Sequence, residues 1–467
     1  MKPQDTKQEY LFQDLGERKV VADFEGGRVT SDSGALLLRE IDQAKGILEH
    51  FSHCFTDMRH PDYIEHGVLE LLCQRVYGLA LGYEDLNDHD ALCSDPLIAT
   101  LVGKTDPLGL NRRRKQDIGK ACAGKSTMNR LELTGDEVND QYKKIIHDPD
   151  KIDETFLEVF ISKHTKAPQA LTIDLDPTDI PLFGHQEGAH YHGYYREDCY
   201  LPIYAFCGHD LLWAKLHTSD EDPAIGAFEA IQYLVTALKK KWPQVNILIR
   251  ADSTFGRDNI MTWCEEHQVD YILGLTSNNR LKKKVLKGLK KARKNYYSPK
   301  KNQRYFYNLR YRTKDTWSKK RRVVAKIEHL SSKPKLKFIV TSLSRKQYNA
   351  KDLYEKVYCA RGDMENRIKE QQLGLFADRT SAQVKRANQL RLYFSAMAYV
   401  LMHSLREIGL KGTTLEKAQM WTIREKLLKI GAVIKISVRR VLFSLSSHHP
   451  SSNLFHKIYH NLQLAFY

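Results

Sequence analysis

The sequence has no apolar stretch long enough to cross a membrane. Its longest apolar run, around Tyr393–Met402, falls well short of the roughly 20 residues that a bilayer requires. The N-terminus, MKPQDTKQEYLFQD, also lacks the apolar region of a signal peptide. These two absences predict a protein of the cytoplasm with no membrane partner.

Paired cysteines are also missing. None of the eight cysteines belongs to a C-x-x-C pair, and the chain is 467 residues long. Scattered cysteines in a large chain indicate reduced thiols rather than a disulfide framework. They also argue against a structural zinc site.

Acidic residues are almost absent from residues 282–337. This segment holds 22 Lys and Arg against Asp315 and Glu328, a net charge of +20 in a chain whose total is +16. Its aromatic residues are Tyr296, Tyr297, Tyr305, Phe306, Tyr307, Tyr311 and Trp317. Cations that track phosphates, interleaved with rings that stack on bases, predict contact with DNA. The alternative is a solvated, partly disordered insertion.

Within this segment, the run Lys319, Lys320, Arg321 and Arg322 is the densest set of candidate phosphate contacts. Trp317 precedes it and is a candidate for stacking on an extruded base. Packing in a core is the more ordinary role of a single Trp.

Residues 1–168 are predicted to form a helical N-terminal region that binds DNA. Apolar residues at helical spacing predict its helices. These are Gly34–His50, Tyr63–Leu81, Ala91–Val102, Asp136–His147 and Asp153–His164. A helix near Thr127–Leu133 either reads DNA or is an ordinary packed helix.

From Ala170 the pattern changes to that of a mixed α/β sheet. The predicted order is strands Ala170–Asp176, Tyr200–Cys207 and Leu211–His217, helix Pro223–Trp242, strand Asn246–Asp252, helix Arg257–His267 and strand Asp270–Leu275. The core is assigned to 169–281 and 338–380, with 282–337 as a β-rich basic insertion. A helical C-terminal region, 381–467, follows. Acids end the first and fourth strands of this sheet.

The run GKACAGKS at 119–126 fits the phosphate loop of nucleotide hydrolases. That loop requires a buried strand directly before it, and the residues here are NRRRKQDI. The context therefore argues against nucleotide binding, although a DNA-dependent ATPase stays an alternative function.

Three acids are the stronger signal. Asp176 and Asp252 lie at strand ends, and Glu365 lies on a predicted helix whose one face carries Tyr358, Arg361, Glu365, Lys369 and Gln372. Cleavage of a phosphodiester needs two divalent ions held by such carboxylates, with Mg²⁺ or Mn²⁺ expected. Asp174, on the same strand face as Asp176, is the alternative first acid. The alternative without a catalytic role is a solvent-exposed helix with i,i+4 ion pairs.

The runs LTIDLDPTDIPLFGHQ, ILIRADSTFGRDNI and YCARGDMENRIK resemble the three catalytic blocks of DDE transposases of bacterial insertion sequences. DFEGGRVTSDSGALLLREID and GKSTMNRLEL are similar to the 1380 group of these transposases. The resemblance implies a ribonuclease-H-like core with a β insertion before the last acid. It also implies catalytic roles for Asp176 (with Thr178), Asp252 and Glu365.

The resemblance extends to a Y-x2-R-x3-E-x6-K signature, which Tyr358, Arg361 and Glu365 match. Gln372 stands at the Lys position, and Lys369, one turn earlier, is its candidate substitute. The implied function is cleavage at the terminal inverted repeats of a transposon and joining of the 3′-hydroxyl to target DNA. In this mechanism Tyr358, Arg361, Lys369 and Thr178 steady phosphates.

The reaction joins two DNA ends, so we expect a dimer on double-stranded DNA in the bacterial nucleoid. The non-enzyme alternative is a relative that binds DNA but has lost activity. The presence of all three acids argues against such a loss.

Overall fold

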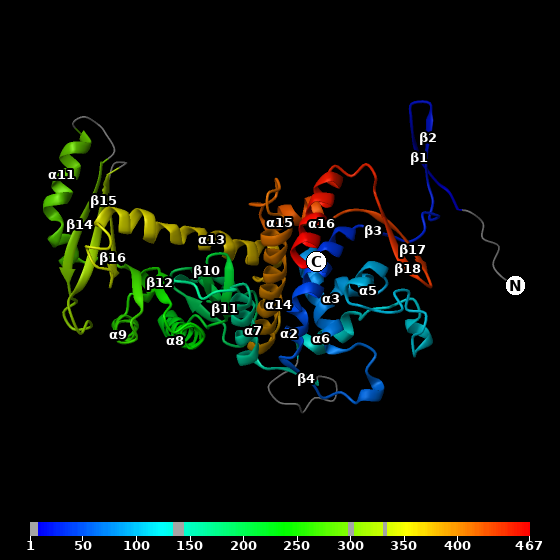
Figure 1. Ribbon diagram of the computed structural model, residues 1–467, viewed down its shortest axis with the longest axis horizontal. Helices are drawn as coiled ribbons and strands as arrows, with labels where there is room; N and C mark the ends of the chain where they lie inside the picture. Colours follow the sequence, from blue (N-terminus) through cyan, green and yellow to red (C-terminus); the bar gives the residue numbers. More distant parts are fainter. Residues whose placement is uncertain (1–7, 134–143, 298–302, 330–333) are drawn as a thin grey trace. The chain divides into compact units, whose positions relative to one another are not determined.

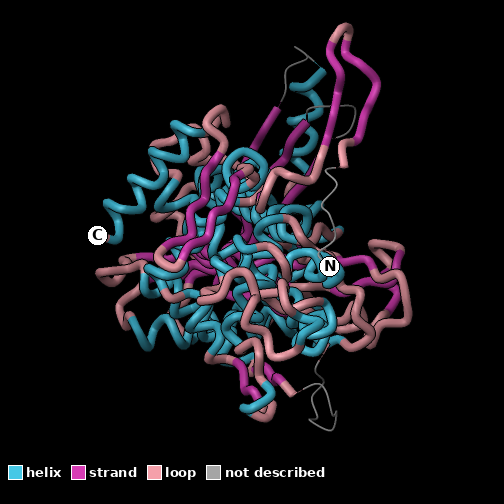
Figure 2. The backbone as a smooth tube through the Cα atoms, turned by 90° about the vertical axis from the view of Figure 1, so that its right-hand side faces the viewer, coloured by secondary structure: helices cyan, strands magenta, loops and turns pink. Residues whose placement is uncertain are grey.

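A computed structural model describes residues 8–133, 144–297, 303–329 and 334–467. Helices and strands are mixed along the chain (Figures 1 and 2). The chain divides into two compact units, one of residues 1–46, 61–129 and 404–467, the other of residues 47–60 and 130–403. The predicted N-terminal region 1–168 is therefore shared between both. No helix of the described residues has the length and hydropathy to cross a membrane.

The second unit is built on an eight-stranded mixed sheet, which confirms the predicted α/β class. The strands are β6 (Ala170–Pro177), β10 (Ile203–Cys207), β11 (Asp210–Lys215), β12 (Asn246–Ala251), β13 (Asp270–Leu275), β14 (Gln303–Tyr311), β15 (Arg321–His329) and β16 (Lys335–Thr341). Their order across the sheet is β11-β10-β6-β12-β13-β16-β15-β14. β12 is parallel to both β6 and β13, and the other pairs are antiparallel.

Helices cover one face of this sheet. They are α7 (Pro149–Ser162), α8 (Pro223–Lys241), α9 (Asp258–Glu266), α10 (Asn279–Lys284) and α11 (Leu286–Tyr297). Asp148 and Asp222 accept backbone N–H groups at the starts of α7 and α8, each just before a Pro at the first helical position. These caps explain why the two predicted helices are confirmed.

A long helical run lies against the other face of the sheet, drawn in yellow in Figure 1. It comprises α12 (Ala350–Asp352), the π-helical segment η6 (Leu353–Tyr358), the 3-10 turn η7 (Cys359–Arg361), α13 (Gly362–Lys369) and the π-helical segment η8 (Glu370–Gly374). Leu353 and Tyr354 pack with Val324 and Ile339 of the sheet in one buried cluster. The strands of the basic segment thus seat the helix that carries Glu365.

The strands of the basic segment, predicted to be a β-rich insertion, extend the main sheet. β16 pairs with β13, with Leu273 opposite Val340. Val323 and Val340 belong to the same buried cluster as Ile249. Periodicity within 282–337 predicts strands, but it cannot show which distant strand they pair with.

The remaining helices and strands complete the second unit. These are α2 (Ile47–Ser52), β4 (Phe55–Asp57), β5 (Ile145–His147), β7 (Ile180–Pro181), β8 (His190–His192), β9 (Glu197–Tyr200) and α14 (Lys385–Ser404). The predicted helix Asp136–His147 is wrong at its end, because β5 pairs with β4 there; residues 134–143 lie outside the described residues. The predicted strand Tyr200–Cys207 is interrupted before Ile203, where Pro202 removes a backbone donor.

The helices of the first unit are α1 (Leu36–Lys45), α3 (Val68–Leu81), α4 (His89–Leu92), α5 (Pro96–Leu101), α15 (Met420–Ile423) and α16 (Ser452–Phe466), with the shorter turns η1 (Ser33–Ala35), η2 (Pro61–Tyr63), η3 (Leu86–Asp88), η4 (Lys115–Asp117), η9 (Leu405–Gly409) and η10 (Arg424–Leu428). Its strands are β1 (Tyr10–Leu15), β2 (Arg18–Ala22), β3 (Val29–Thr30), β17 (Ala432–Ser437) and β18 (Arg440–Leu445). α6 (Lys125–Glu132) lies at the boundary of the two units.

Several predictions for the two helical regions are wrong in detail. The helix predicted at Gly34–His50 is broken at Gly46, which adopts a φ of 63° and ends α1. The helix predicted at Ala91–Val102 restarts at Pro96 behind an Asp95 cap. The N-terminal region, predicted to be helical, also contains the hairpin β1–β2, and the C-terminal region contains the hairpin β17–β18. Short strands whose partners lie far away, such as β3 with β17, carry little local signal.

Candidate active site

The two predicted aspartates lie at one edge of the sheet. β6 and β12 run parallel, with Leu175 opposite Ala251. Asp176 and Asp252 are the next residues of their strands, so both carboxylates emerge at the same edge. The side chain of Asp176 is only 12% exposed.

Arg361 links Asp176 to the predicted third acid. Its Nη1 lies 2.8 Å from Oδ1 of Asp176, and its Nη2 lies 3.5 Å from Oε1 of Glu365. The side chain of Glu365 is 56% exposed, so this acid faces solvent at the rim. The structure therefore gathers the acids of β6 and α13 around one guanidinium.

Asp174, the alternative first acid, is occupied by another cation. Nε and Nη2 of Arg250 lie 2.5 and 2.7 Å from its two carboxylate oxygens, and Asp174 is buried. Nη1 of Arg250 also donates to the carbonyl oxygen of Val357 in η6. This pair fixes the helix of Glu365 against β6 and β12, which leaves Asp176 as the better candidate. Sequence reasoning missed Arg250, although an Arg inside the apolar run ILIRAD was a usable signal.

Asp252 is held by the turn that follows it. Its carboxylate accepts hydrogen bonds from the backbone N–H and the hydroxyl of Thr254, at 2.8 and 3.1 Å. Gly274 of β13 packs directly against this turn. A Cβ at Gly274 would lie 2.6 Å from the amide nitrogen of Ser253 and 2.9 Å from the hydroxyl oxygen of Tyr358. The missing side chain therefore allows Asp252 and Tyr358 to approach each other.

The structure also gives Gln372 a contact. Its Nε2 donates to the hydroxyl of Thr178 at 3.2 Å and to the carbonyl of Asp179 at 3.0 Å. Gln372 thus ties the helical run to the loop after Asp176. Lys369, the candidate substitute for the signature Lys, is exposed to solvent.

Burial is the main influence on the protonation of Asp176. Burial raises the pKa of Asp176 to about 7, and the nearby charges of Asp252 and Glu365 act in the same direction against Arg361. Burial also raises the pKa of Tyr358. The ion pair with Arg361 therefore does not offset the effect of burial on the pKa of Asp176.

This donor set fits a hard divalent cation. Carboxylate oxygens are the ligands that Mg²⁺ and Mn²⁺ take in proteins. Asp176, Asp252 and Glu365 would hold such ions, and the guanidinium of Arg361 marks a place for positive charge beside Asp176. Three carboxylates at one edge of a mixed sheet define a candidate metal-dependent phosphodiester site.

The predicted DNA contacts in the basic segment fall into two groups. Lys319 and Lys320 are exposed, although Lys319 pairs with Glu265 at 2.8 Å. Arg322 is half-buried and donates to backbone carbonyls.

The other two predicted contacts are not on the surface. The side chain of Arg321 is 2% exposed and pairs with Asp258 and Glu265 at 2.5 and 2.8 Å. Trp317 is buried and packs edge-on against Tyr311, with ring centroids 5.6 Å apart. Their burial conflicts with direct contact to DNA, since both serve the packing of α9 and the sheet.

The exposed charge of the segment instead gathers on α10 and α11. Gly288 and Ala292 face the sheet, where Gly288 packs against the ring of Tyr307. The exposed basic residues are Lys282, Lys283, Lys284, Lys287, Lys290, Lys291, Arg293 and Lys294. This set forms a basic helical surface.

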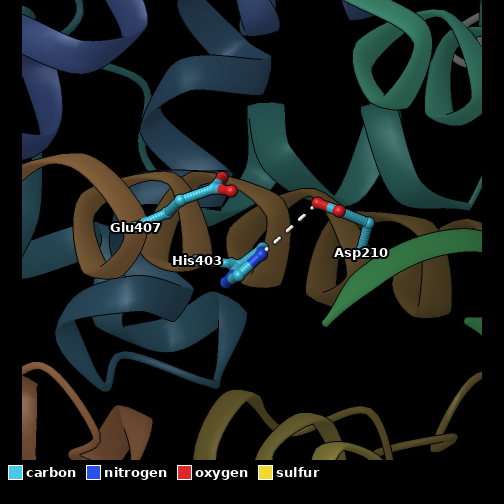
Figure 3. Close-up of side chains that lie close together, drawn as sticks. All are labelled: Asp210, His403 and Glu407. Atoms are coloured by element: carbon cyan, nitrogen blue, oxygen red, sulfur yellow. Dashed lines mark ion pairs between the residues drawn. The ribbon is translucent and has the colours of Figure 1, made fainter. Parts of the chain in front are cut away.

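A separate cluster that contains a histidine and acids lies at the end of α14 (Figure 3). Nε2 of His403 lies 3.3 Å from Oδ1 of Asp210, and the ammonium of Lys163 pairs with the same oxygen. These partners, of which the hydrogen bond from His403 is the strongest, outweigh burial and lower the pKa of Asp210 to about 2. Asp210 is thus already neutralised, unlike the acids around Arg361. Glu407 follows His403 by four residues.

The phosphate-loop pattern has no phosphate cradle. It follows the short turn η4 rather than a strand. The backbone amides of Cys122, Ala123 and Lys125 donate to Cys93, Gln74 and Asp90 within the protein. These N–H groups are already hydrogen-bonded within the protein, as expected from the sequence context.

Comparison with known proteins identifies the family. The family model described as Transposase DDE domain group 1 matches residues 12–466, and the chain therefore belongs to this family of DDE transposases. A search of curated proteins found no match. Among solved structures, the chain is similar to a piggyBac transposase in a synaptic complex with hairpin DNA, at 11% identity, over 85% of this chain and 80% of that one. The TM-score is 0.38, so this likeness carries no argument.

Proposed function

We propose that this protein is an insertion-sequence transposase of the 1380 group that cuts transposon ends and joins them to target DNA. The observation that carries the proposal is the meeting of Asp176, Arg361 and Glu365 beside Asp252 at one sheet edge. Membership of the DDE transposase family supports it. The order β11-β10-β6-β12-β13, with antiparallel strands followed by parallel ones, supports a ribonuclease-H-like core.

The proposed reaction has two phosphoryl-transfer steps. Water attacks the phosphodiester at the transposon end, and the bond to the 3′ oxygen breaks to free a 3′-hydroxyl. That hydroxyl then attacks a phosphodiester of target DNA and displaces its 3′ oxygen. Two Mg²⁺ or Mn²⁺ ions supply charge stabilisation for the attacking and leaving oxygens when bound.

The residues of the chain position the DNA for these steps. Asp176, Asp252 and Glu365 hold the ions, whereas Arg361, Tyr358 and Lys369 steady the phosphates. Gln372 fixes Thr178 and the loop after β6. The basic surface of α10 and α11 grips the duplex through its backbone. Cutting two ends together implies a dimer on DNA, in the bacterial cytoplasm.

A cleavage assay tests the proposal. Purified protein is incubated with a terminal inverted-repeat duplex and Mg²⁺ or Mn²⁺, and nicking is followed on a denaturing gel. Glu365→Gln is expected to abolish nicking while binding persists. Asp363→Asn is the matched control, because Asp363 is an exposed acid two residues away on α13.

Equal nicking by wild type and Glu365→Gln would refute the assigned site. Binding without nicking by the wild type would favour the inactive DNA-binding relative. Nucleotide binding that is lost in Lys125→Ala would revive the ATPase alternative, which the consumed amides of residues 122–125 disfavour.

A further inference from the structure

A hollow of 570 Å³ lies at the edge of the sheet away from the acids. It is lined by Glu265, Tyr271, Leu309, Arg310, Lys319, Lys320, Arg321, Arg322, Thr341, Ser342, Leu343, Ser344 and Arg345. Six of these residues are basic and one is acidic. The sequence predicted Lys319, Lys320, Arg321 and Arg322 as phosphate contacts, but it singled out neither Arg310 nor Arg345.

Two arginines of this hollow face each other across neighbouring strands. Arg310 of β14 is the direct register partner of Arg322 of β15. Side chains of such partners stand on the same face of the sheet, and like charges there are destabilising. Burial lowers the pKa of Arg322, and the positive charge of Arg345 acts in the same direction. Arg310, Arg322 and Arg345 all line the same hollow.

The hydrogen bonds of Arg322 all go to neutral acceptors. These are Oδ1 of Asn308 and the carbonyl oxygens of Leu343 and Tyr348, at 2.8–2.9 Å. Within the described part of the chain, no carboxylate forms an ion pair with Arg310, Arg322 or Arg345. The positive charge is thus held in place by the fold but is not neutralised by it.

The neighbouring cations Arg321 and Lys319, unlike these three arginines, are paired with acids. Arg321 and Lys319 both pair with Glu265, and Arg321 pairs with Asp258 as well. The one acid that lines the hollow is therefore already engaged. A structural ion-pair network accounts for Arg321 but leaves the three other arginines without an anion.

We propose that Arg310, Arg322 and Arg345 form a second phosphate site, which takes a backbone phosphate of DNA away from the point of cleavage. Guanidinium groups match phosphate geometry and are the usual choice for such contacts. The hydroxyl groups of Ser342 and Ser344 line the same hollow and add donors. Lys320 stands exposed at its rim.

The site is separated from the acids along the strands. β13 begins beside the hollow, where Tyr271 lines it, and ends beside Asp252, where Gly274 packs. From Asp270 to Gly274 the strand covers about 13 Å. The phosphate held by the arginines is therefore not the one that is cut. Such a contact positions the duplex and reads no sequence.

The inference rests on the proposed function only in its choice of DNA as the ligand. Its test is a binding assay without divalent ions, so that it does not depend on cleavage. Kd for a transposon-end duplex is measured over a range of salt concentrations for wild type and for the double variant Arg310→Gln/Arg345→Gln. Arg322 is left intact because it also holds the backbone of Leu343 and Tyr348.

The expected result is weaker binding and a loss of about one in the slope of log K against log salt, because the arginines contact one phosphate. The matched control is Lys240→Gln/Lys241→Gln, which removes two exposed charges from α8 of the same unit. The control is expected to keep the wild-type slope. A double arginine variant with an unchanged slope would overturn the proposal.

A thermal melt separates this role from a structural one. Removing like charges that face each other should leave the Tm of the free protein unchanged or raise it, although DNA binding weakens. A fall in Tm matching the loss of binding would indicate a packing role instead.

If free nucleotide or inorganic phosphate binds here and competes, while the DNA salt slope is unaffected by the variant, the site takes a small phosphate compound and the DNA assignment is wrong. A wild type that binds no DNA at any salt would overturn the proposed function as well.

Discussion

The two ends of the eight-stranded sheet carry opposite and incomplete sets of charge. At one end Asp176, Asp252 and Glu365 surround the single guanidinium of Arg361. At the other end Arg310, Arg322 and Arg345 line one hollow, and no carboxylate among the described residues forms an ion pair with them. Between the ends, charges are matched, as in the buried pair of Asp174 and Arg250.

This difference distinguishes ligand-binding sites from ion pairs that stabilise the fold. A matched pair is complete within the protein, so its removal costs stability. An unmatched set is completed by something outside the chain, so its removal costs binding or reaction. This distinction can be tested directly, because both kinds occur on the same strands.

The largest expected effect comes from comparing Asp176 with Asp174 on β6. Asp176→Asn is expected to lower cleavage by about a thousand-fold, since a carboxylate that holds an ion stabilises the transition state by several kcal/mol. Asp174→Asn should instead lower the free energy of unfolding by about 3 kcal/mol, because it leaves the buried Arg250 without its partner. Denaturant melts and nicking assays of both variants check this. If Asp174→Asn instead lowers cleavage and Asp176→Asn lowers the free energy of unfolding, Asp174 is the catalytic acid.

Gly274→Ala tests the close approach behind the acidic end. A Cβ there meets the backbone of Asp252 and Ser253 below 3 Å. We expect a loss of about 2–3 kcal/mol in the free energy of unfolding, together with impaired cleavage, because the turn that holds Asp252 must shift. Gly362→Ala is the control, since nothing lies within 4 Å of its added Cβ. The control should be neutral or stabilising by up to about 1 kcal/mol. Equal tolerance of both changes would show that the approach at Gly274 is not needed.

The charge-matched group at Asp210 predicts a pH dependence of stability that involves neither the acids around Arg361 nor the three arginines of the hollow. His403 and Lys163 lower the pKa of Asp210 from 3.8 to about 2. A depressed carboxyl pKa stabilises the fold above the unfolded pKa, and this stability is lost as the pH falls through the folded pKa. The free energy of unfolding should therefore fall by about 2 kcal/mol between pH 4 and pH 2 on account of this group.

Asp210→Asn should flatten that part of the profile, as urea melts at several pH values would show. Asp315→Asn, at an exposed position, is the control. A profile that keeps its full slope in Asp210→Asn would assign the acid sensitivity elsewhere.

The smallest expected effect concerns Arg361, which pairs with Asp176 at the acidic end. It occupies the carboxylate of Asp176, so Arg361→Gln should tighten Mn²⁺ binding in the absence of DNA by about tenfold. Cleavage should nevertheless fall, because the phosphate loses a donor. Mn²⁺ titration followed by electron paramagnetic resonance measures the first effect without reference to activity. Weaker Mn²⁺ binding by Arg361→Gln would show that Arg361 supports the ions instead of competing with them.

The strands and helices of the core were predictable because their signals are local. The acids at the ends of Ala170–Asp176 and Asn246–Asp252 follow apolar runs, and parallel strands bring such ends together. The caps Asp148 and Asp222 mark α7 and α8 in the sequence. Candidate residues Asp176, Asp252, Arg361 and Glu365 accordingly lie together in the structure.

The remainder depended on contacts that no local pattern records. The pairing of β16 with β13 turned a predicted insertion into part of the main sheet. It also buried Trp317 and Arg321, which the charge pattern alone had placed at the DNA. The pairing of β3 with β17 was likewise invisible, because β3 is only two residues long and its partner lies hundreds of residues away.

The sequence by itself determined the α/β class, the three acids and the basic character of residues 282–337, since each follows from composition and short-range periodicity. Only the tertiary structure decided which charges are matched. Asp174 and Asp176 are two residues apart and carry the same side chain. Arg321 and Arg322 are adjacent and also carry the same side chain. Their roles diverge because Arg250 reaches one acid, and because Asp258 and Glu265 reach one arginine, across strands and helices that are distant in the chain.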